Sequence, residues 1–267
     1  DSEVVYGPAQ LDFDLQSVVG MYDGWLAHTS GWDGDSSLAP GWRVVEAAAL
    51  NFSVNPRLLL ALLEHQSGLL TKTGDDLTLE HNPYNLNDWQ YEGLGNQLIW
   101  IAERLNAGYY GWRSGKWMEI KLADGLAFPL NRRLNAGTVA VYNVFAPLYA
   151  TAEIEHIGSP EGFAATYREL FGDPFSYEVP LIRHDLQQPL FDLPFEPGVV
   201  WNFTGGPHNT WRDSPPWSAI DFAPRLAFTG CQEVQDWVTA MAPGIVTRIQ
   251  DGVVALNLDA DGYEGTG

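Results

Sequence analysis

The sequence predicts an α+β protein in which a mainly helical first part precedes a β-rich second part. Apolar segments with helical start and stop signals occupy residues 1–180. Prolines accumulate between residues 176 and 198, where the helical periodicity ends. The chain after them contains short alternating segments and an Asp-Gly turn, which are typical of antiparallel β structure. We therefore expect two domains, residues 1–180 and residues 181–267.

Helices of the first domain are predicted from apolar spacing and from residues that favour helix ends. The clearest helix begins at Asn55, which caps it, and at Pro56, which has no amide hydrogen to leave unsatisfied. Its apolar run continues to Gln66, so we expect a helix that is buried on most sides and ends near Gly68. Further helices are expected at residues 11–28, 42–50, 95–107, 135–149 and 161–171.

Strands of the second domain are predicted from alternation and turn residues. We expect strands at residues 190–195, 199–204, 217–222, 243–250 and 253–258, the last two joined by Asp251 and Gly252 in a hairpin. Between the second and third of these strands, Gly205, Gly206 and Pro207 predict a tight loop that directs His208 into a cleft.

Asp221 is the unusual residue of the strand predicted at 217–222. Because side chains alternate along a strand, Asp221 shares one face with Trp217 and Ala219. A carboxylate on an otherwise apolar strand is costly to bury without a partner or a metal. Imidazole nitrogen and carboxylate oxygen are ordinary zinc ligands, so His208 and Asp221 are candidate ligands of one zinc ion.

The segments around these two residues resemble a known family. Gly-Gly-Pro-His ending at His208, followed by Ser-Ala-Ile-Asp-Phe around Asp221, resembles the first half of the site in lysostaphin/LytM-type zinc endopeptidases. The separation of thirteen positions resembles their β-lytic branch. The resemblance implies Zn²⁺ as the cofactor, His208 and Asp221 as metal ligands, and peptidoglycan cross-links or Gly-rich peptides as substrates. Taken singly, a loop histidine is more often a surface residue, and a strand aspartate more often caps a turn.

The rest of that family's site is missing from this sequence. The family takes its third ligand and its proton-transferring histidine from a later His-x-His motif, and none of the six histidines follows His208. The resemblance therefore places the catalytic residues beyond Gly267. We expect this chain to be an inactive fragment of a longer enzyme with an incomplete β-rich peptidase domain.

A second resemblance concerns the first domain. Residues 55–68, NPRLLLALLEHQSG, resemble the helix of lysozyme-like lytic transglycosylases that ends in Glu-Ser-Gly, and the segment from Ala140 to Asn143 resembles their Ala-Tyr-Asn motif. The resemblance implies a lysozyme-like domain over residues 1–180. Gln66 stands where that family has its catalytic acid, and Glu64 lies about 200° around the helix. We expect no glycan cleavage by this domain, and a buried core helix without such a function is the alternative.

Composition excludes several classes of partner. The chain has 14 Lys and Arg against 34 Asp and Glu, a net charge of −20, which argues against nucleic acid or an anionic membrane as the main partner. No run approaches the roughly 20 apolar residues of a membrane span. Cys231 is the single cysteine, so no internal disulfide forms. Seven aromatic residues present stacking faces to sugars or pack in the core: Trp89, Tyr91, Trp100, Tyr109, Tyr110, Trp112 and Trp117.

The sequence as a whole indicates a secreted bacterial cell-wall hydrolase. Its expected partner is peptidoglycan or a peptide substrate. The alternative is a non-catalytic cell-wall-binding or scaffold module of a wall-remodelling system. A His-x-His motif after Gly267 in the parent chain would distinguish the enzyme from the module. The sequence does not indicate an oligomeric state.

Overall fold

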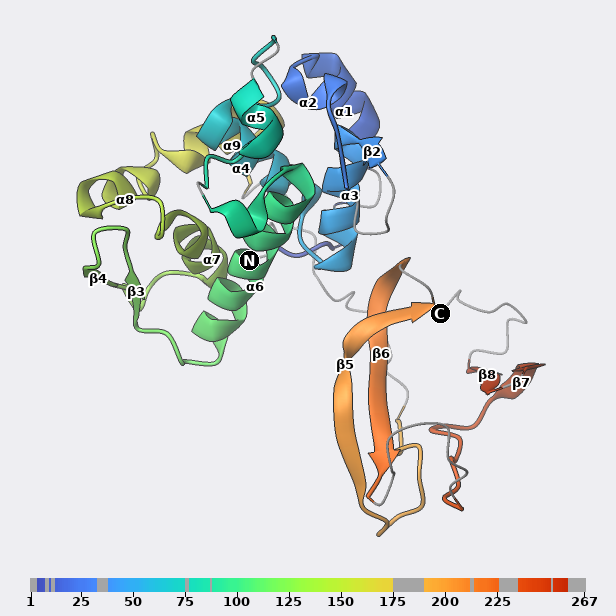
Figure 1. Ribbon diagram of the computed structural model, residues 1–267. Helices are drawn as coiled ribbons and strands as arrows, with labels where there is room; N and C mark the ends of the chain where they lie inside the picture. Colours follow the sequence, from blue (N-terminus) through green and yellow to red (C-terminus); the bar gives the residue numbers. More distant parts are fainter. Residues whose placement is uncertain are drawn as a thin grey trace. The chain divides into compact units, whose positions relative to one another are not determined.

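The computed structural model describes most of the chain: residues 4–7, 10, 13–32, 38–74, 77–86, 88–174, 190–211, 214–225, 235–250 and 252–258. The predicted α+β class is confirmed, with helices, short two-stranded sheets and two longer hairpins (Figure 1). Contacts between Cα atoms divide the chain into two units. One comprises Asp1–Leu181 with Asn209–Trp217, and the other comprises Ile182–His208 with Ser218–Gly267. The predicted boundary after residue 180 and Cys231 both lie outside the described residues.

The first unit is built from helices around one core. Its helices are α1 Leu15–Tyr22, α2 Trp25–His28, α3 Gly41–Asn51, α4 Pro56–Ser67, α5 Leu77–His81, α6 Leu94–Arg113, α7 Ala136–Phe145, α8 Thr151–Ile157 and α9 Phe163–Phe171, with a 3₁₀ turn at Trp89–Tyr91. The buried apolar side chains of these helices and of the turns between them form a single cluster.

Helix α4 is buried in that core, as the sequence predicted. Asn55 caps its first turn by accepting a hydrogen bond from the backbone N–H of Arg57 at 2.8 Å. Gly68 ends the helix with a φ of +70°, which a side chain would disfavour. Every residue from Leu58 to Leu63 is at most 3% exposed, so the expectation of burial on most sides is confirmed.

Helices α6 and α7 pack closely and are joined by a reciprocal pair of hydrogen bonds. Arg104 Nε donates to the backbone oxygen of Asn143 at 3.0 Å, and Asn143 Nδ2 donates to the backbone oxygen of Arg104 at 2.7 Å. A Cβ on Gly108 would lie 2.8 Å from the Cα of Ala140, so glycine allows the two backbones to approach. Asn143, the last residue of the segment that resembles Ala-Tyr-Asn, is buried in this contact.

Two predicted helices are shorter in the structure. The helix expected at residues 11–28 is divided into α1 and α2 by Asp23, whose φ is +51°, and by Gly24. A Cβ on Gly24 would lie 1.9 Å from the backbone oxygen of Leu70, so close tertiary packing decides the break. The helix expected to reach residue 149 ends at Phe145, because Pro147 has no amide hydrogen to donate to the backbone oxygen of Asn143, which accepts from Arg104 instead. The sequence prediction missed α5 and α8, which are short.

Two small antiparallel sheets in the first unit were also missed. Strand β1 Ser30–Trp32 pairs with β2 Leu38–Pro40. Strand β3 Glu119–Lys121 pairs with β4 Ala127–Pro129, with Ile120 opposite Phe128. Strands of three residues are too short to show a recognisable alternation in the sequence.

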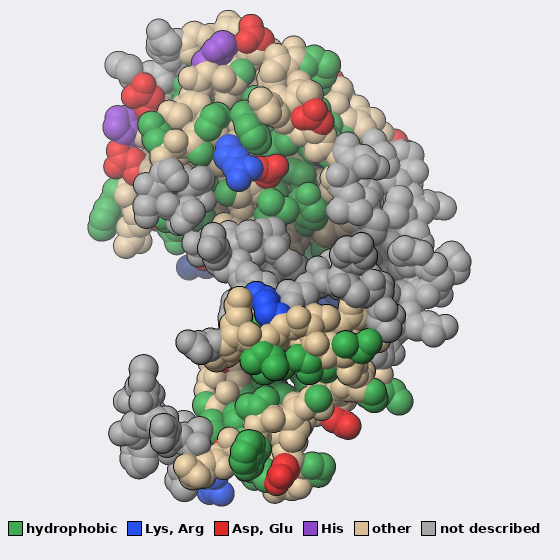
Figure 2. All heavy atoms as spheres, turned by 90° about the vertical axis from the view of Figure 1, so that its right-hand side faces the viewer, with side chains coloured by type: hydrophobic (Ala, Val, Ile, Leu, Met, Phe, Trp, Pro, Cys, Tyr) green, Lys and Arg blue, Asp and Glu red, His purple; other side chains and the backbone are tan. Residues whose placement is uncertain are grey.

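The second unit contains the β7–β8 hairpin and the part of the β5–β6 hairpin outside Asn209–Trp217. Strand β5 Trp201–Trp211 pairs with β6 Ser214–Pro224, which confirms the strand expected at residues 217–222. Strands β7 Ile245–Gln250 and β8 Val253–Asn257 form the predicted antiparallel hairpin, and Gly252 has a φ of +74° in its turn. Many large apolar side chains of these strands are exposed, and Figure 2 shows hydrophobic side chains on the surface of one face of the molecule.

The strand expected at residues 190–195 is wrong. Only Phe195 pairs there, in an isolated bridge with Val238. Asp192 N–H donates to the backbone oxygen of Met241 at 2.8 Å, and Thr239 N–H donates to that of Pro194 at 3.0 Å. Pro194 has no amide hydrogen, so it cannot donate to a regular ladder.

Candidate functional site

The two predicted metal ligands lie on paired strands of the second unit. His208 belongs to β5 and Asp221 to β6. The predicted tight loop before His208 is wrong, because β5 runs through Gly205 and Pro207. A proline is tolerated in a two-stranded sheet, where a strand leaves half of its amides without a ladder partner.

The carboxylate of Asp221 lies beside Gly205. Its Oδ2 is 3.1 Å from the point that a Cβ at residue 205 would occupy, so a larger residue there would press on the carboxylate. Phe222, the next residue of β6, contacts Phe195 and Phe203 with ring centroids 5.6 and 5.9 Å apart. These aromatic contacts hold the part of β6 that carries Asp221.

The structure corrects the argument that a buried Asp221 needs a metal or another partner. The proximity of His208 to Asp221 remains a prediction. Asp221 is exposed, so the cost of burying a carboxylate on an apolar strand does not arise. The side chain of His208 lies outside what the structure describes. Within the described ranges, no three His, Cys, Asp or Glu side chains gather so that they could hold a metal ion. The assignment of His208 and Asp221 to one metal site therefore remains a prediction.

A second candidate site lies at the end of α4 in the first unit. Gln66 accepts a hydrogen bond from the phenol of Tyr149 at 2.8 Å, across 83 positions of sequence. Glu64 has a different role: its carboxylate accepts hydrogen bonds from the backbone N–H groups of Leu70 at 2.9 Å and Thr71 at 3.2 Å. Glu64 thus stabilises the turn after α4 and faces away from Gln66, as expected from the helical spacing.

Tyr84 completes this site. It is fully buried, and its hydroxyl has no hydrogen-bond partner among the residues that the structure describes. Burial, and then the nearby phenol of Tyr149, raise the pKa of Tyr84 well above its ordinary value. Burial also raises the pKa of Tyr149, against the opposing effect of its hydrogen bond to Gln66. The amide and the two phenols can donate and accept hydrogen bonds, but none of them exchanges a proton readily near neutral pH.

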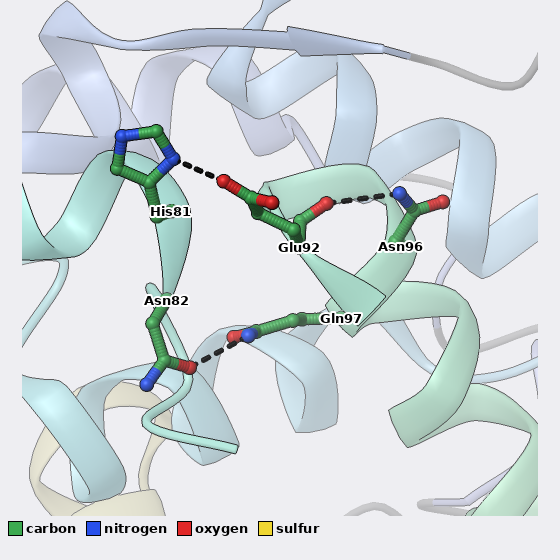
Figure 3. Close-up of polar contacts among 5 residues, drawn as sticks. All are labelled: His81, Asn82, Glu92, Asn96 and Gln97. Carbon is green, nitrogen blue, oxygen red and sulfur yellow. Dashed lines mark hydrogen bonds and ion pairs between the residues drawn. The ribbon is translucent and has the colours of Figure 1, made fainter. Parts of the chain in front are cut away.

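A network of polar contacts holds Tyr84 in place, and Figure 3 shows two of its members, Asn82 and Gln97. The Oε1 of Gln97 on α6 accepts a hydrogen bond from the backbone N–H of Tyr84 at 2.6 Å. Its Nε2 donates to Oδ1 of Asn82 at 2.7 Å, and Asn82 also accepts from the backbone N–H of Leu86 at 2.7 Å. The exposed pair of His81 and Glu92 lies beside this network and joins α5 to the segment that leads into α6.

His65, next to Gln66 in sequence, is a packing residue. Its ring lies edge-on to Phe145 and Phe163, with centroids 5.5 and 5.6 Å away, and its Nδ1 is 2.8 Å from Oγ1 of Thr166. Burial, and then the electrostatic effect of His156, lower the pKa of His65. Its imidazole joins α4 to α9.

The aromatic residues of the first unit divide between core and surface. Trp100 and Tyr109 are buried in the core, whereas Trp89 is 83% exposed and Tyr110 is also exposed. The sequence pointed to Gln66 but not to Tyr84 or Tyr149. No local signal indicated them, because contacts across 83 positions depend on the packing of α4 against the segment after α7.

These features define the class as an α+β protein with a helical N-terminal unit. The chain belongs to the family described as LasA, N-terminal domain, whose model matches residues 1–184. No curated protein and no solved structure matches the chain. LasA is a secreted staphylolytic peptidase, and the matched region covers the helices but not strands β5 to β8. No helix in the described part of the chain is long and apolar enough to span a membrane.

Proposed function

We propose that the chain is part of a secreted zinc endopeptidase that cuts peptidoglycan cross-links or Gly-rich peptides. The observation that carries the proposal is the pairing of β5 with β6, which places the carboxylate of Asp221 beside Gly205, three positions before His208 on the neighbouring strand. Membership of a family named after a staphylolytic peptidase supports the cell-wall substrate.

The donor set suits zinc. An exposed carboxylate at Asp221 and an imidazole at His208 are two of the oxygen and nitrogen ligands that zinc prefers. When bound, zinc lowers the pKa of a bound water towards about 7 and polarises the scissile carbonyl. Catalytic zinc sites generally use three protein ligands, and the third is expected from a His-x-His motif that this sequence does not contain.

The test compares residues 1–267 with a longer parent chain that carries the His-x-His motif. We expect weak zinc binding and no cleavage of a pentaglycine peptide by residues 1–267, and tight equimolar zinc with cleavage by the parent. In the parent, His208→Ala and Asp221→Ala should each abolish tight zinc binding, whereas His28→Ala, a change at an exposed histidine of the first unit, should not. Full zinc binding by the Asp221→Ala parent would refute the assignment.

A non-catalytic cell-wall-binding module is the second candidate, and the first unit supplies the observation that favours it. Gln66 replaces a proton-exchanging group with an amide that is hydrogen-bonded to Tyr149, and Trp89 exposes a ring face suited to stacking on a sugar. Co-sedimentation with insoluble peptidoglycan tests this function. The module is supported if Trp89→Ala abolishes retention and Met21→Ala does not. Met21 is the control because it is another exposed apolar side chain.

A further inference from the structure

A groove of about 760 Å³ lies in the first unit between β3, α6 and α7. Strand β3 with its flanking residues forms one side of the groove. Arg104, Asn143 and Pro147 contribute to the other side. Gln66 and Tyr149 do not line this groove, so it is distinct from the site at the end of α4.

One edge of β3 faces away from its partner strand. Leu130 N–H donates to the backbone oxygen of Met118 and Leu122 N–H to that of Leu126, both at 2.9 Å. Hydrogen-bonded positions alternate in an antiparallel pair, so Glu119 and Lys121 direct their backbone groups towards the other edge. Pro129, which has no amide hydrogen, lies opposite Glu119 and agrees with this register.

The outer edge of β3 already pairs with another segment at one end. Ala123 follows Glu119 and Lys121 on the same edge, and its N–H donates to the backbone oxygen of Tyr149 at 3.1 Å. No backbone group among the described residues pairs with Glu119 or Lys121 at this edge. Two donors and two acceptors of β3 therefore remain available beside the groove.

The groove is basic although the whole chain carries a net charge of −20. Residues 104–133 contain six Lys and Arg but two Asp and Glu. Three cationic residues line the groove, namely Arg104 and two of the chain's three lysines, Lys116 and Lys121, against one acidic residue, Glu119. Arg104 is half-buried and lies over the ring of Trp100, 5.6 Å from its centroid. No carboxylate in the described part of the chain forms an ion pair with any of these three cations.

We propose that this groove binds an extended acidic segment of a partner polypeptide, which adds as a strand to the free edge of β3. The backbone groups of Glu119 and Lys121 would supply the ladder hydrogen bonds. Carboxylates of the segment would pair with Lys116, Lys121 and Arg104, which selects acidic sequences. A free strand edge favours a peptide over nucleic acid, because only a peptide backbone can continue the alternating ladder.

The first test uses a fluorescent peptide of about seven residues that alternates Glu and Val, a length typical of a strand. Anisotropy during titration with residues 1–267 should show saturable binding that weakens as salt is added. N-methylation of the amides along one edge of the peptide should abolish binding, and N-methylation along the opposite edge should not. Equal binding by both methylated peptides would overturn strand addition, as would the absence of saturable binding at millimolar protein.

The second test changes the groove. The double variant Lys116→Glu, Lys121→Glu should bind the acidic peptide roughly tenfold more weakly, because attraction at two exposed positions becomes repulsion. Lys72→Glu is the matched control, since Lys72 is the third lysine and lies outside the groove. Equal weakening by Lys72→Glu would overturn the site. Tighter binding of a single-stranded oligonucleotide than of the peptide, with the same dependence on Lys116 and Lys121, would overturn the choice of partner.

Discussion

Replacing Gln97 by Met removes the side chain that holds Tyr84 in the first unit. Gln97 is 1% exposed and makes two hydrogen bonds, from the backbone N–H of Tyr84 and to Oδ1 of Asn82. Met has a similar length but no hydrogen-bonding amide, so the change tests the polar contacts more than the packing.

The expected cost follows from what each partner keeps. Asn82 Oδ1 still accepts the N–H of Leu86, so losing its bond to Gln97 costs about 1 kcal/mol. The N–H of Tyr84 belongs to a fully buried residue and loses the acceptor that Gln97 supplies, which costs about 1–3 kcal/mol. We therefore expect Gln97→Met to lower the free energy of unfolding by about 2–4 kcal/mol.

Urea denaturation followed by far-ultraviolet circular dichroism measures this change, because the helices lie in the first unit. Asn96→Ala is the matched control: the neighbouring side chain donates one hydrogen bond, to the backbone oxygen of Glu92 at 2.9 Å (Figure 3). It should cost about 1 kcal/mol or less. A loss below about 1 kcal/mol for Gln97→Met, or equal losses for both variants, would refute the reasoning.

Three further predictions concern the first unit. Gly24→Ala should lower the free energy of unfolding by about 1–3 kcal/mol, because the new Cβ would meet the backbone oxygen of Leu70. Its control is Gly20→Ala in α1, where the Cβ has open space, and this change should raise the free energy of unfolding by about 0.5–1 kcal/mol in the same urea assay. Folding lowers the pKa of His65, so its stabilising contribution is present above about pH 6.5 and is lost as pH falls below that value. Urea midpoints at several pH values should show this loss, and His65→Phe should reduce it. Residues 1–180 should release no new reducing ends from peptidoglycan, because Gln66 stands at the position of the resembled family's catalytic acid. Turnover that Glu64→Gln abolishes would show that Glu64 is the catalytic acid and would contradict this prediction.

Local sequence signals determined much of the helical framework. Asn55 and Pro56 start α4 and Gly68 ends it, because capping and backbone preference act within a few residues. The Asp251–Gly252 hairpin was predictable for the same reason, since its turn residues favour the required backbone. The pattern around His208 and Asp221 suggested a metal site, and the pairing of β5 with β6 brings its two strands together.

Only the tertiary structure decided which distant residues meet. The contact of Gln66 with Tyr149, the burial of Tyr84 and the closeness of Gly24 to Leu70 all join segments far apart in sequence, where no periodicity carries information. The continuation of β5 through Pro207 also depended on a partner strand. Pairing with β6 outweighed the turn preference of Gly205 and Gly206, because ladder hydrogen bonds and aromatic contacts act across strands whereas turn preferences are local.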